Sequence, residues 1–221
     1  MSAHPEITLY YHPRACSLAC HIALEESELP FAAHEINIRA GGHKKDEYLR
    51  VNPWGKLPAL CIGDQVLTEA HAILTFIADS VPDKRLMPPA ATLERARAHE
   101  WLNFLSSTVH IAFRPLFRTA MLAGADGPLE QVKRAGIPIL QGTLGEVDRR
   151  LANRCWALGD TYSVCDAYLL VFWIWSQRED VVSYAPEMPN WRALSERVYA
   201  RPATQRALAR ERLTAAALKA A

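Results

Sequence analysis

Cys16 is the residue of this sequence whose type and position best suit nucleophilic chemistry. It follows the turn-forming pair Pro13-Arg14 and stands at the start of a helical pattern, and Ser17 is placed to donate a hydrogen bond to its sulfur. The first turn of a helix carries unpaired backbone N–H groups and about half a positive charge, so we expect the thiol pKa to fall below its usual ~8.5. The alternative is a small buried side chain, as most free cysteines are. Cys20 is not spaced as C-x-x-C, so no dithiol couple is predicted.

Pro58, near the start of a short apolar stretch, is the second feature. Proline is tolerated in strands only at edges or with special geometry. A cis bond after Leu57 would turn the N–H and C=O groups of that residue toward solvent, where they can pair with a peptide-like ligand as an added strand does. The alternative is an ordinary trans proline, which is the commoner isomer.

Thr68-Glu69-Ala70 stands at a strand-to-helix junction. Capping of the following helix by Thr68 or Glu69 is a sufficient structural explanation. In the functional interpretation, Glu69 binds an ammonium group and the N–H of Ala70 meets a carboxylate at the helix start.

A polar stripe follows in the second part of the chain. Asn103, Ser107, His110 and Arg114 recur at i, i+4, i+7 and i+11 and therefore share one helix face. The neighbouring face is apolar and consists of Leu102, Leu105, Val109 and Phe113. Short hydrogen-bonding groups suit the wall of a cleft, although a polar face is more often only solvated. His110, with an unperturbed pKa of ~6.5, is the member suited to stabilising an anionic sulfur.

The elements that position these residues form two groups. The first 81 residues predict the order β-α-β-α-β-β-α, which is the thioredoxin-like arrangement. These elements are expected at Ile7–Tyr11, Ala15 to about Glu26, Phe31–Ile38, Asp46–Arg50, Leu57–Ile62, Gln65–Thr68 and Glu69–Ser80. A proline-rich linker is predicted over residues 82–91.

Residues 92–221 are predicted to form an all-α domain. Helical periodicity covers Leu93–Phe117, Leu129–Leu151, Asp166–Ser176 and Trp191–Arg201. Ser163 and Asp166 form a capping-box signature at the start of the third helix, which we interpret as structural.

Composition excludes several classes of function. A formal net charge of +1 with scattered basic residues argues against a nucleic-acid partner. The longest apolar run, Ala167–Trp175, is too short for the ~20 residues of a membrane span. Five cysteines without framework spacing, and no signal-peptide pattern over Met1–Pro5, favour a reducing compartment, the cytoplasm. The spacing of the remaining histidines predicts no metal site.

Together these segments resemble the bacterial beta-class glutathione S-transferases. The similarity runs from about Leu9 to Leu213. It rests on Tyr10-Tyr11-His12-Pro13-Arg14-Ala15-Cys16-Ser17, Asn52-Pro53-Trp54-Gly55-Lys56-Leu57-Pro58, Leu67-Thr68-Glu69, Glu100-Trp101-Leu102-Asn103-Phe104 with His110, and Gly159-Asp160 with Ser163-x-x-Asp166.

The resemblance implies a role for each matching residue. Cys16 and His110 would be catalytic, with Cys16 meeting the glutathione sulfur and able to form a mixed disulfide with it. Glutathione, the co-substrate, would be bound by Lys56, Leu57, Pro58, Glu69, Ala70, Asn103 and Ser107. A homodimer without metal is also implied. Three departures concern glutathione binding: Ala70 replaces a Ser or Gly, Ile111 replaces a frequent lysine, and the loop over residues 40–46 is short.

The expected activity is attack of the glutathione thiolate on a small electrophile or a disulfide, and a cysteine at this position favours disulfide exchange. Two alternatives are kept. One is a non-catalytic binding protein for apolar molecules, a ligandin. The other is a glutathione-dependent dehalogenase or isomerase on the same scaffold.

Overall fold

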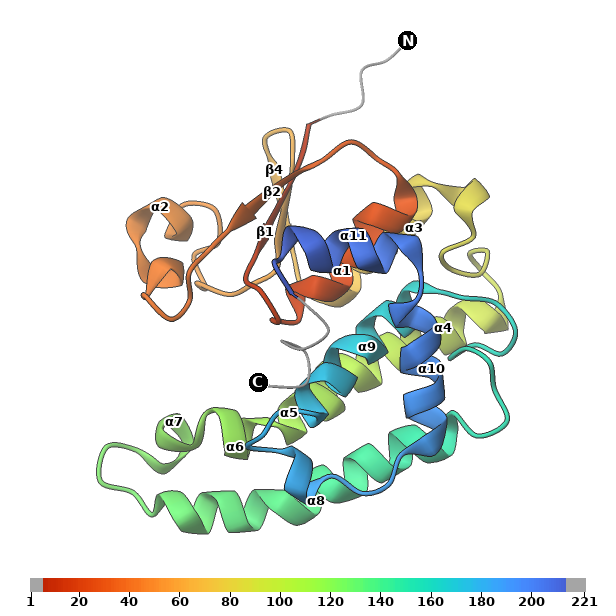
Figure 1. The fold of residues 1–221 in the computed structure, drawn as a ribbon. Helices are drawn as coiled ribbons and strands as arrows, with labels where there is room; N and C mark the ends of the chain where they lie inside the picture. The colour runs from red at the N-terminus through yellow and green to blue at the C-terminus, as the bar shows by residue number, and fades with distance from the viewer. Residues whose placement is uncertain (1–5, 214–221) are drawn as a thin grey trace.

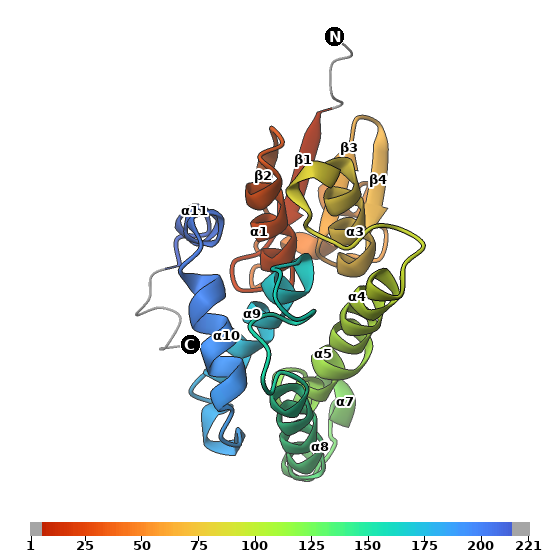
Figure 2. The ribbon, with the colours of Figure 1, turned by 90° about the vertical axis from the view of Figure 1, so that its right-hand side faces the viewer.

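The computed structural model describes residues 6–213 (Figures 1 and 2). The segment on which the absence of a signal peptide is predicted, residues 1–5, lies outside this range. The thioredoxin-like part consists of β1 (Ile7–Tyr11), α1 (Ser17–Ser27), β2 (Ala32–Glu35), α2 (Asp46–Leu49), β3 (Ala59–Ile62), β4 (Gln65–Thr68) and α3 (Ala70–Ser80). The predicted order is confirmed, with a second strand shorter than the expected Phe31–Ile38.

The sheet has the order β2-β1-β3-β4. β1 pairs in parallel with β2 and antiparallel with β3, and β3 forms an antiparallel hairpin with β4. β1 alternates between buried and half-buried residues, and its central Leu9 is fully buried against the helices. β1 and β3 are the two central strands of the sheet. The predicted site residues in the turn after β1 and next to the start of β3 therefore lie at its centre.

The helical part follows a 3-10 turn over Pro82–Lys84. It consists of α4 (Leu93–Phe104), α5 (His110–Ala112), α6 (Arg114–Phe117), α7 (Thr119–Ala123), α8 (Leu129–Arg150), α9 (Val164–Ser176), α10 (Pro189–Tyr199) and α11 (Pro202–Arg210). All four strands of the sheet lie in the first part of the described chain, so the predicted fold class is confirmed. The domain boundaries at residues 81 and 91 stay predictions.

The predicted single helix over Leu93–Phe117 is interrupted. A π-helical segment, Leu105–Val109, separates α4 from α5. Ser106 and Ser107 both donate hydroxyl hydrogen bonds to the C=O of Asn103, which competes with regular helical pairing. Pro115 adds a second break, because it lacks the N–H that a continuing helix needs.

α1 is enclosed by other helices. All of its residues except Glu26 are buried, and it packs against α3, α9 and α11 (Figure 2). The last of these helices was not predicted as a separate element, although Pro202 at its first turn is a typical start. Just after it, Glu211 accepts a hydrogen bond from His21 at 2.9 Å, and both side chains are fully buried. The predicted capping box of α9 is confirmed, with the N–H of Ser163 donating to Asp166 at 2.8 Å.

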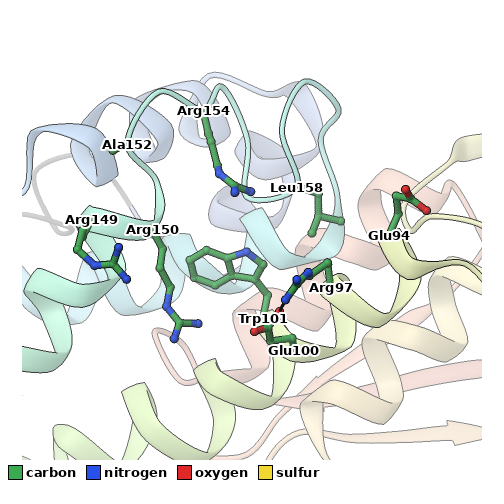
Figure 3. A pocket seen from close by; sticks show the side chains of 9 residues that line it. All are labelled: Glu94, Arg97, Glu100, Trp101, Arg149, Arg150, Ala152, Arg154 and Leu158. Atoms are coloured by element: carbon green, nitrogen blue, oxygen red, sulfur yellow. Dashed lines mark hydrogen bonds and ion pairs between the residues drawn. The ribbon is translucent and has the colours of Figure 1, made fainter.

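A cavity of about 550 Å3 lies in the helical part, between α4 and the C-terminal end of α8 (Figure 3). The indole of Trp101 lies among arginine side chains, and the guanidinium of Arg150 lies 4.1 Å from the ring centre of Phe104. The charged residues that line the cavity are Glu94, Arg97, Glu100, Arg149, Arg150 and Arg154. None of the predicted site residues lines it, so this cavity is separate from the predicted site.

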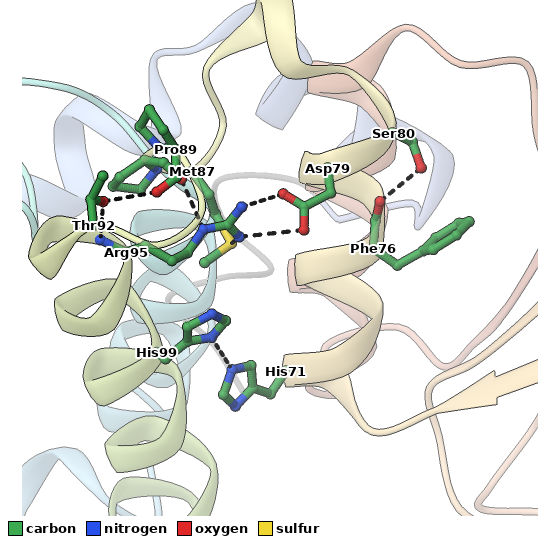
Figure 4. A network of polar contacts seen from close by, with 10 residues as sticks. His71, Phe76, Asp79, Ser80, Met87, Pro89, Thr92, Arg95 and His99 are labelled. Carbon is green, nitrogen blue, oxygen red and sulfur yellow. Dashed lines mark hydrogen bonds and ion pairs between the residues drawn. The ribbon is translucent and has the colours of Figure 1, made fainter.

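The two parts also meet through polar contacts between α3 and α4 (Figure 4). Arg95 forms an ion pair with Asp79, and its Nε donates to the C=O of Pro88 at 2.8 Å. One turn further along α4, Nδ1 of His99 lies 2.8 Å from Nε2 of His71. These contacts hold α4 against α3, the helix that begins at Ala70. From α4 the chain continues toward His110.

Candidate active site

Cys16 lies at the end of the turn that joins β1 to α1. It is the N-cap residue of α1, with φ −60° and ψ −18°. The turn is closed by a reciprocal pair of bonds: the N–H of His12 donates to Oγ of Ser17 at 3.2 Å, and that hydroxyl lies 3.3 Å from the C=O of His12. Ser17 therefore holds the turn, whereas the sequence suggested that it would donate to the sulfur.

The sulfur of Cys16 is buried but has polar neighbours. The residue is 8% exposed, and its thiol donates to the C=O of Leu57 at 3.5 Å. Burial raises the pKa of the Cys16 thiol to about 12; the backbone N–H groups of Cys16 and Ser17 lower it, but by less, and Glu69 raises it further. The expected fall below the usual pKa is therefore wrong, because desolvation outweighs the helix N-terminus. At neutral pH Cys16 is a thiol and a hydrogen-bond donor.

The bond between Leu57 and Pro58 is cis, as the functional interpretation predicted. Leu57 is half-buried, and Lys56 before it is exposed. The C=O of Lys56 accepts from the phenol of Tyr48 and from Nδ2 of Asn52, the latter at 2.9 Å. These two side chains hold the segment in place. Sequence reasoning missed both, because the burial of Asn52, which requires a hydrogen-bond partner for its amide, is visible only in the structure.

Glu69 is exposed and directly precedes α3. Its backbone has φ 68°, a region that non-glycine residues rarely occupy. It makes no side-chain capping hydrogen bond, so the structural explanation by capping does not apply to this residue. Its negative charge is one of the causes that raise the pKa values of Cys16 and Tyr168, after the burial of each group.

On the helical side, the predicted apolar face is confirmed: its four members are completely buried. Asn103 and Ser107 are exposed on the neighbouring face, but the hydroxyl of Ser107 donates to the C=O of Asn103 at 2.8 Å. Within residues 6–213, no hydrogen bond joins either residue to Cys16 or Leu57. The π-helical segment alters the regular spacing on which the polar stripe was predicted.

His110 is half-buried against aromatic rings. Its ring centre lies 4.9 Å from that of Trp175 and 5.7 Å from that of Phe172. Burial lowers the pKa of His110 to about 4, and the charges of Arg114, Arg118 and Lys56 lower it further. The imidazole is therefore neutral at physiological pH, so it can offer one N–H donor but no positive charge.

Trp175 connects the helical part to the Cys16 turn. Its indole N–H donates to the C=O of Arg14 at 2.7 Å, and its ring contacts His110 edge to face. From its sequence, Trp175 was expected only in a core helix, without this role. The signal was its indole N–H, which requires a partner when the ring is buried. The structure thus brings Cys16, Leu57 and Glu69 together, and it links His110 to the same turn through Trp175.

Comparisons with known proteins identify the family of this chain. The glutathione S-transferase N-terminal domain family matches residues 5–79. The glutathione S-transferase GstA of Escherichia coli O157:H7 is 35% identical over 93% of this chain and 98% of its own length. The chain belongs to the glutathione S-transferase family.

Two solved structures support the same assignment for this glutathione S-transferase. The beta-class enzyme of Sphingomonas chungbukensis is 36% identical, with a TM-score of 0.80 over 94% of this chain and 100% of that chain. A sphingomonad glutathione S-transferase complexed with glutathione is 34% identical, with the same TM-score and coverage. The resemblance found in the sequence is therefore confirmed, and the chain is an enzyme of this family.

Within residues 6–213, this glutathione S-transferase has no cluster of three or more potential metal-ligating side chains. Over the same range, none of its helices has the length and apolar character needed to cross a bilayer.

Proposed function

We propose that this enzyme holds glutathione against the thioredoxin-like part and stabilises its thiolate with the neutral thiol of Cys16. The observation that carries the proposal is the position of that sulfur. The sulfur lies at the start of α1, beside the backbone N–H groups of Cys16 and Ser17. Its own proton is donated to the C=O of Leu57. A donor that stays protonated at neutral pH can stabilise an anionic sulfur without adding a negative charge.

The backbone around Leu57 would bind the peptide part of glutathione. No hydrogen-bond partner of the Leu57 N–H lies within residues 6–213, so this group is available to a ligand. Glu69 would accept from the ammonium group of glutathione, and the N–H of Ala70 at the start of α3 would meet the adjacent carboxylate. Lys56, exposed beside the cis peptide, would pair with the second carboxylate, while Pro58 holds the segment in shape.

The helical part would close the site from the other side. His110 would donate its single N–H as a neutral imidazole, and Asn103 and Ser107 would offer polar atoms from the exposed face. In the reaction, the glutathione thiol loses its proton to solvent. Its sulfur then forms a bond to a carbon of the electrophile, and the leaving group departs with the electron pair of the broken bond. Dehalogenation is the same step with halide as the leaving group.

Conjugation is favoured over disulfide exchange. Exchange through Cys16 requires its thiolate to attack a disulfide. With a pKa of about 12, only about one molecule in 10^5 carries that thiolate at pH 7. The scarcity of this thiolate reverses the preference for exchange that the residue type alone suggested.

The test compares the two routes in one protein. Exposed Cys155 is first replaced by alanine to remove unrelated labelling. Cys155→Ala is then assayed for conjugation of 1-chloro-2,4-dinitrobenzene, and its intact mass is measured after incubation with oxidised glutathione at pH 7. We expect turnover, an unchanged mass over minutes, and a loss of turnover of about tenfold when Cys16→Ala is added. Rapid addition of one glutathione, or full turnover without Cys16, would contradict the proposal.

We also propose a cytoplasmic homodimer. All five cysteines are free, which suits a reducing compartment. Trp54 is 83% exposed, an unusual position for so large an apolar side chain unless another surface covers it. Sedimentation of the wild type and of Trp54→Ala would test the dimer, which should weaken in the variant. The alternative of a ligandin for apolar molecules is not favoured, because the lining of the cavity in Figure 3 is largely charged.

A further inference from the structure

Two arginines stand one helical turn apart at the edge of the site. Arg114 begins α6, and the N–H of Arg118 donates to the C=O of Arg114 at 2.8 Å. Both side chains are exposed, and within residues 6–213 neither forms an ion pair. Like charges at this spacing repel each other and destabilise a helix. An anion between the two guanidinium groups would remove that cost.

An aromatic surface lies beside these charges. Phe117, between the two arginines in sequence, packs against Trp175 with ring centres 5.4 Å apart and stacks on Phe113 at 5.3 Å. The guanidinium of Arg178 covers Phe117 at 4.3 Å and is already paired with Asp180 at 2.9 Å. The cluster therefore combines flat rings with two arginines that pair with no carboxylate of the described chain.

The same cluster borders the Cys16 turn. Trp175 donates to the C=O of Arg14 in that turn and contacts His110. Basic side chains from both parts converge there. The pKa of His43, before α2, is lowered by its burial and then by Lys44, Arg118 and Lys56. The pKa of Arg14 is lowered by burial and then by Arg178 and Arg39. Of these basic groups, Arg118 lies directly beside Phe117 in the sequence, and together with Arg114 it is considered for the second substrate.

We propose that the second substrate of this enzyme is an organic anion: a planar electrophile whose carboxylate or sulfonate is bound by Arg114 and Arg118 while its ring packs beside Phe117. The inference rests on the proposed function, because it assigns the partner that the glutathione thiolate attacks. Guanidinium groups pair with planar oxyanions through two parallel hydrogen bonds, and they retain their charge at any physiological pH.

Binding of two matched conjugates tests the proposal without requiring turnover. S-(4-carboxybenzyl)glutathione and S-(4-nitrobenzyl)glutathione have nearly the same shape and differ by one negative charge. Calorimetric titration of the wild-type protein should give an affinity about tenfold higher for the carboxylate, the size expected for a charge-assisted hydrogen bond. The ratio should shrink as salt is raised, since the arginines are exposed.

The double variant Arg114→Gln, Arg118→Gln should bring the ratio of the two affinities to within about twofold, because each glutamine removes a charge. Arg192→Gln, at an exposed arginine of α10 that forms no ion pair within the described chain, is the control and should keep the wild-type ratio.

Each other outcome has a definite meaning. Equal affinity of the wild type for the two conjugates would overturn the proposal and leave the proposed function intact. A preference that persists in the double variant would overturn the assignment to these arginines. Failure of glutathione and of both conjugates to bind would overturn the proposed function itself.

Discussion

The two sides of the site are built by different means. On the thioredoxin-like side, the groups proposed to bind glutathione include backbone atoms of Leu57 and Ala70, set by a cis peptide and a helix start, beside the side chains of Cys16, Lys56 and Glu69. On the helical side the proposed binding groups are side chains: His110, Arg114 and Arg118, which lie on or next to the short helices α5 and α6, after the π-helical segment. Backbone geometry suits one constant ligand. Side chains on short, interrupted helices can differ without a change of fold. They therefore suit a second substrate that differs between proteins of the same fold.

The largest expected effect is on the stability of the protein, through the contacts of Glu211 that anchor the thioredoxin-like side. Glu211→Ala should lower the free energy of unfolding by about 3–5 kcal/mol, because it removes one member of a buried pair and leaves His21 without its partner. It also removes the acceptor of the Arg14 N–H in the Cys16 turn. Urea denaturation measures the change. Exposed Glu187→Ala is the control, with a change within about 0.5 kcal/mol. Equal stability of both variants would show that the turn needs no anchor from the C-terminal segment.

Glu69→Gln is expected to weaken the binding of glutathione and to leave the binding of the electrophile nearly unchanged. The substitution keeps the shape and removes the charge proposed to meet the ammonium group, so KM for glutathione should rise about ten- to a hundredfold. KM for the electrophile should change little. Steady-state kinetics with each substrate varied in turn separate the two, and Glu187→Gln serves as the matched control. An equal rise in both values would contradict the division of the site into two sides.

His110→Gln should have a smaller effect on turnover, about threefold, because glutamine also offers an N–H donor. Its pH dependence is more informative. The unfolded chain binds a proton at this residue below pH ~6.5, whereas the folded protein does so only near its pKa of about 4. The wild type therefore loses stability as pH falls through this window, and the variant should lose less. Denaturation at pH 7 and pH 5 tests this; identical losses in both proteins would refute the neutral, buried state of His110.

Ser107→Ala should have the smallest effect. The hydroxyl is already bonded to the C=O of Asn103 in its own helix. KM for glutathione should change by no more than about twofold, within the range of a weak neutral contact. A tenfold rise would instead make Ser107 a direct ligand and extend the glutathione side onto α4.

Sequence reasoning predicted the first side better than the second. The order of strands and helices and the junction at Glu69 follow from local signals that do not depend on distant residues, whereas the sequence left the cis and trans isomers of the Leu57-Pro58 bond open. The pKa of Cys16 was expected to fall and is raised, because its burial depends on how α1 packs against the rest of the molecule. The break after Phe104 was missed for a similar reason, since serine hydroxyls compete with helical pairing only in a particular context. The pairing of Glu211 with His21 joins residues that are far apart in the chain and leaves no local signal.

The enclosure of α1 has a consequence for how the protein is made and how it unfolds. Because this helix is covered by α9 and α11 as well as by its own sheet, residues 1–81 alone would present a wide apolar surface to water. The N-terminal segment leaves the ribosome first, yet the N–H of Arg14 in the turn bearing Cys16 gains its acceptor only when Glu211 has been synthesised. The two parts should therefore melt in one cooperative transition, and the division of this chain into domains describes its topology rather than independent folding units.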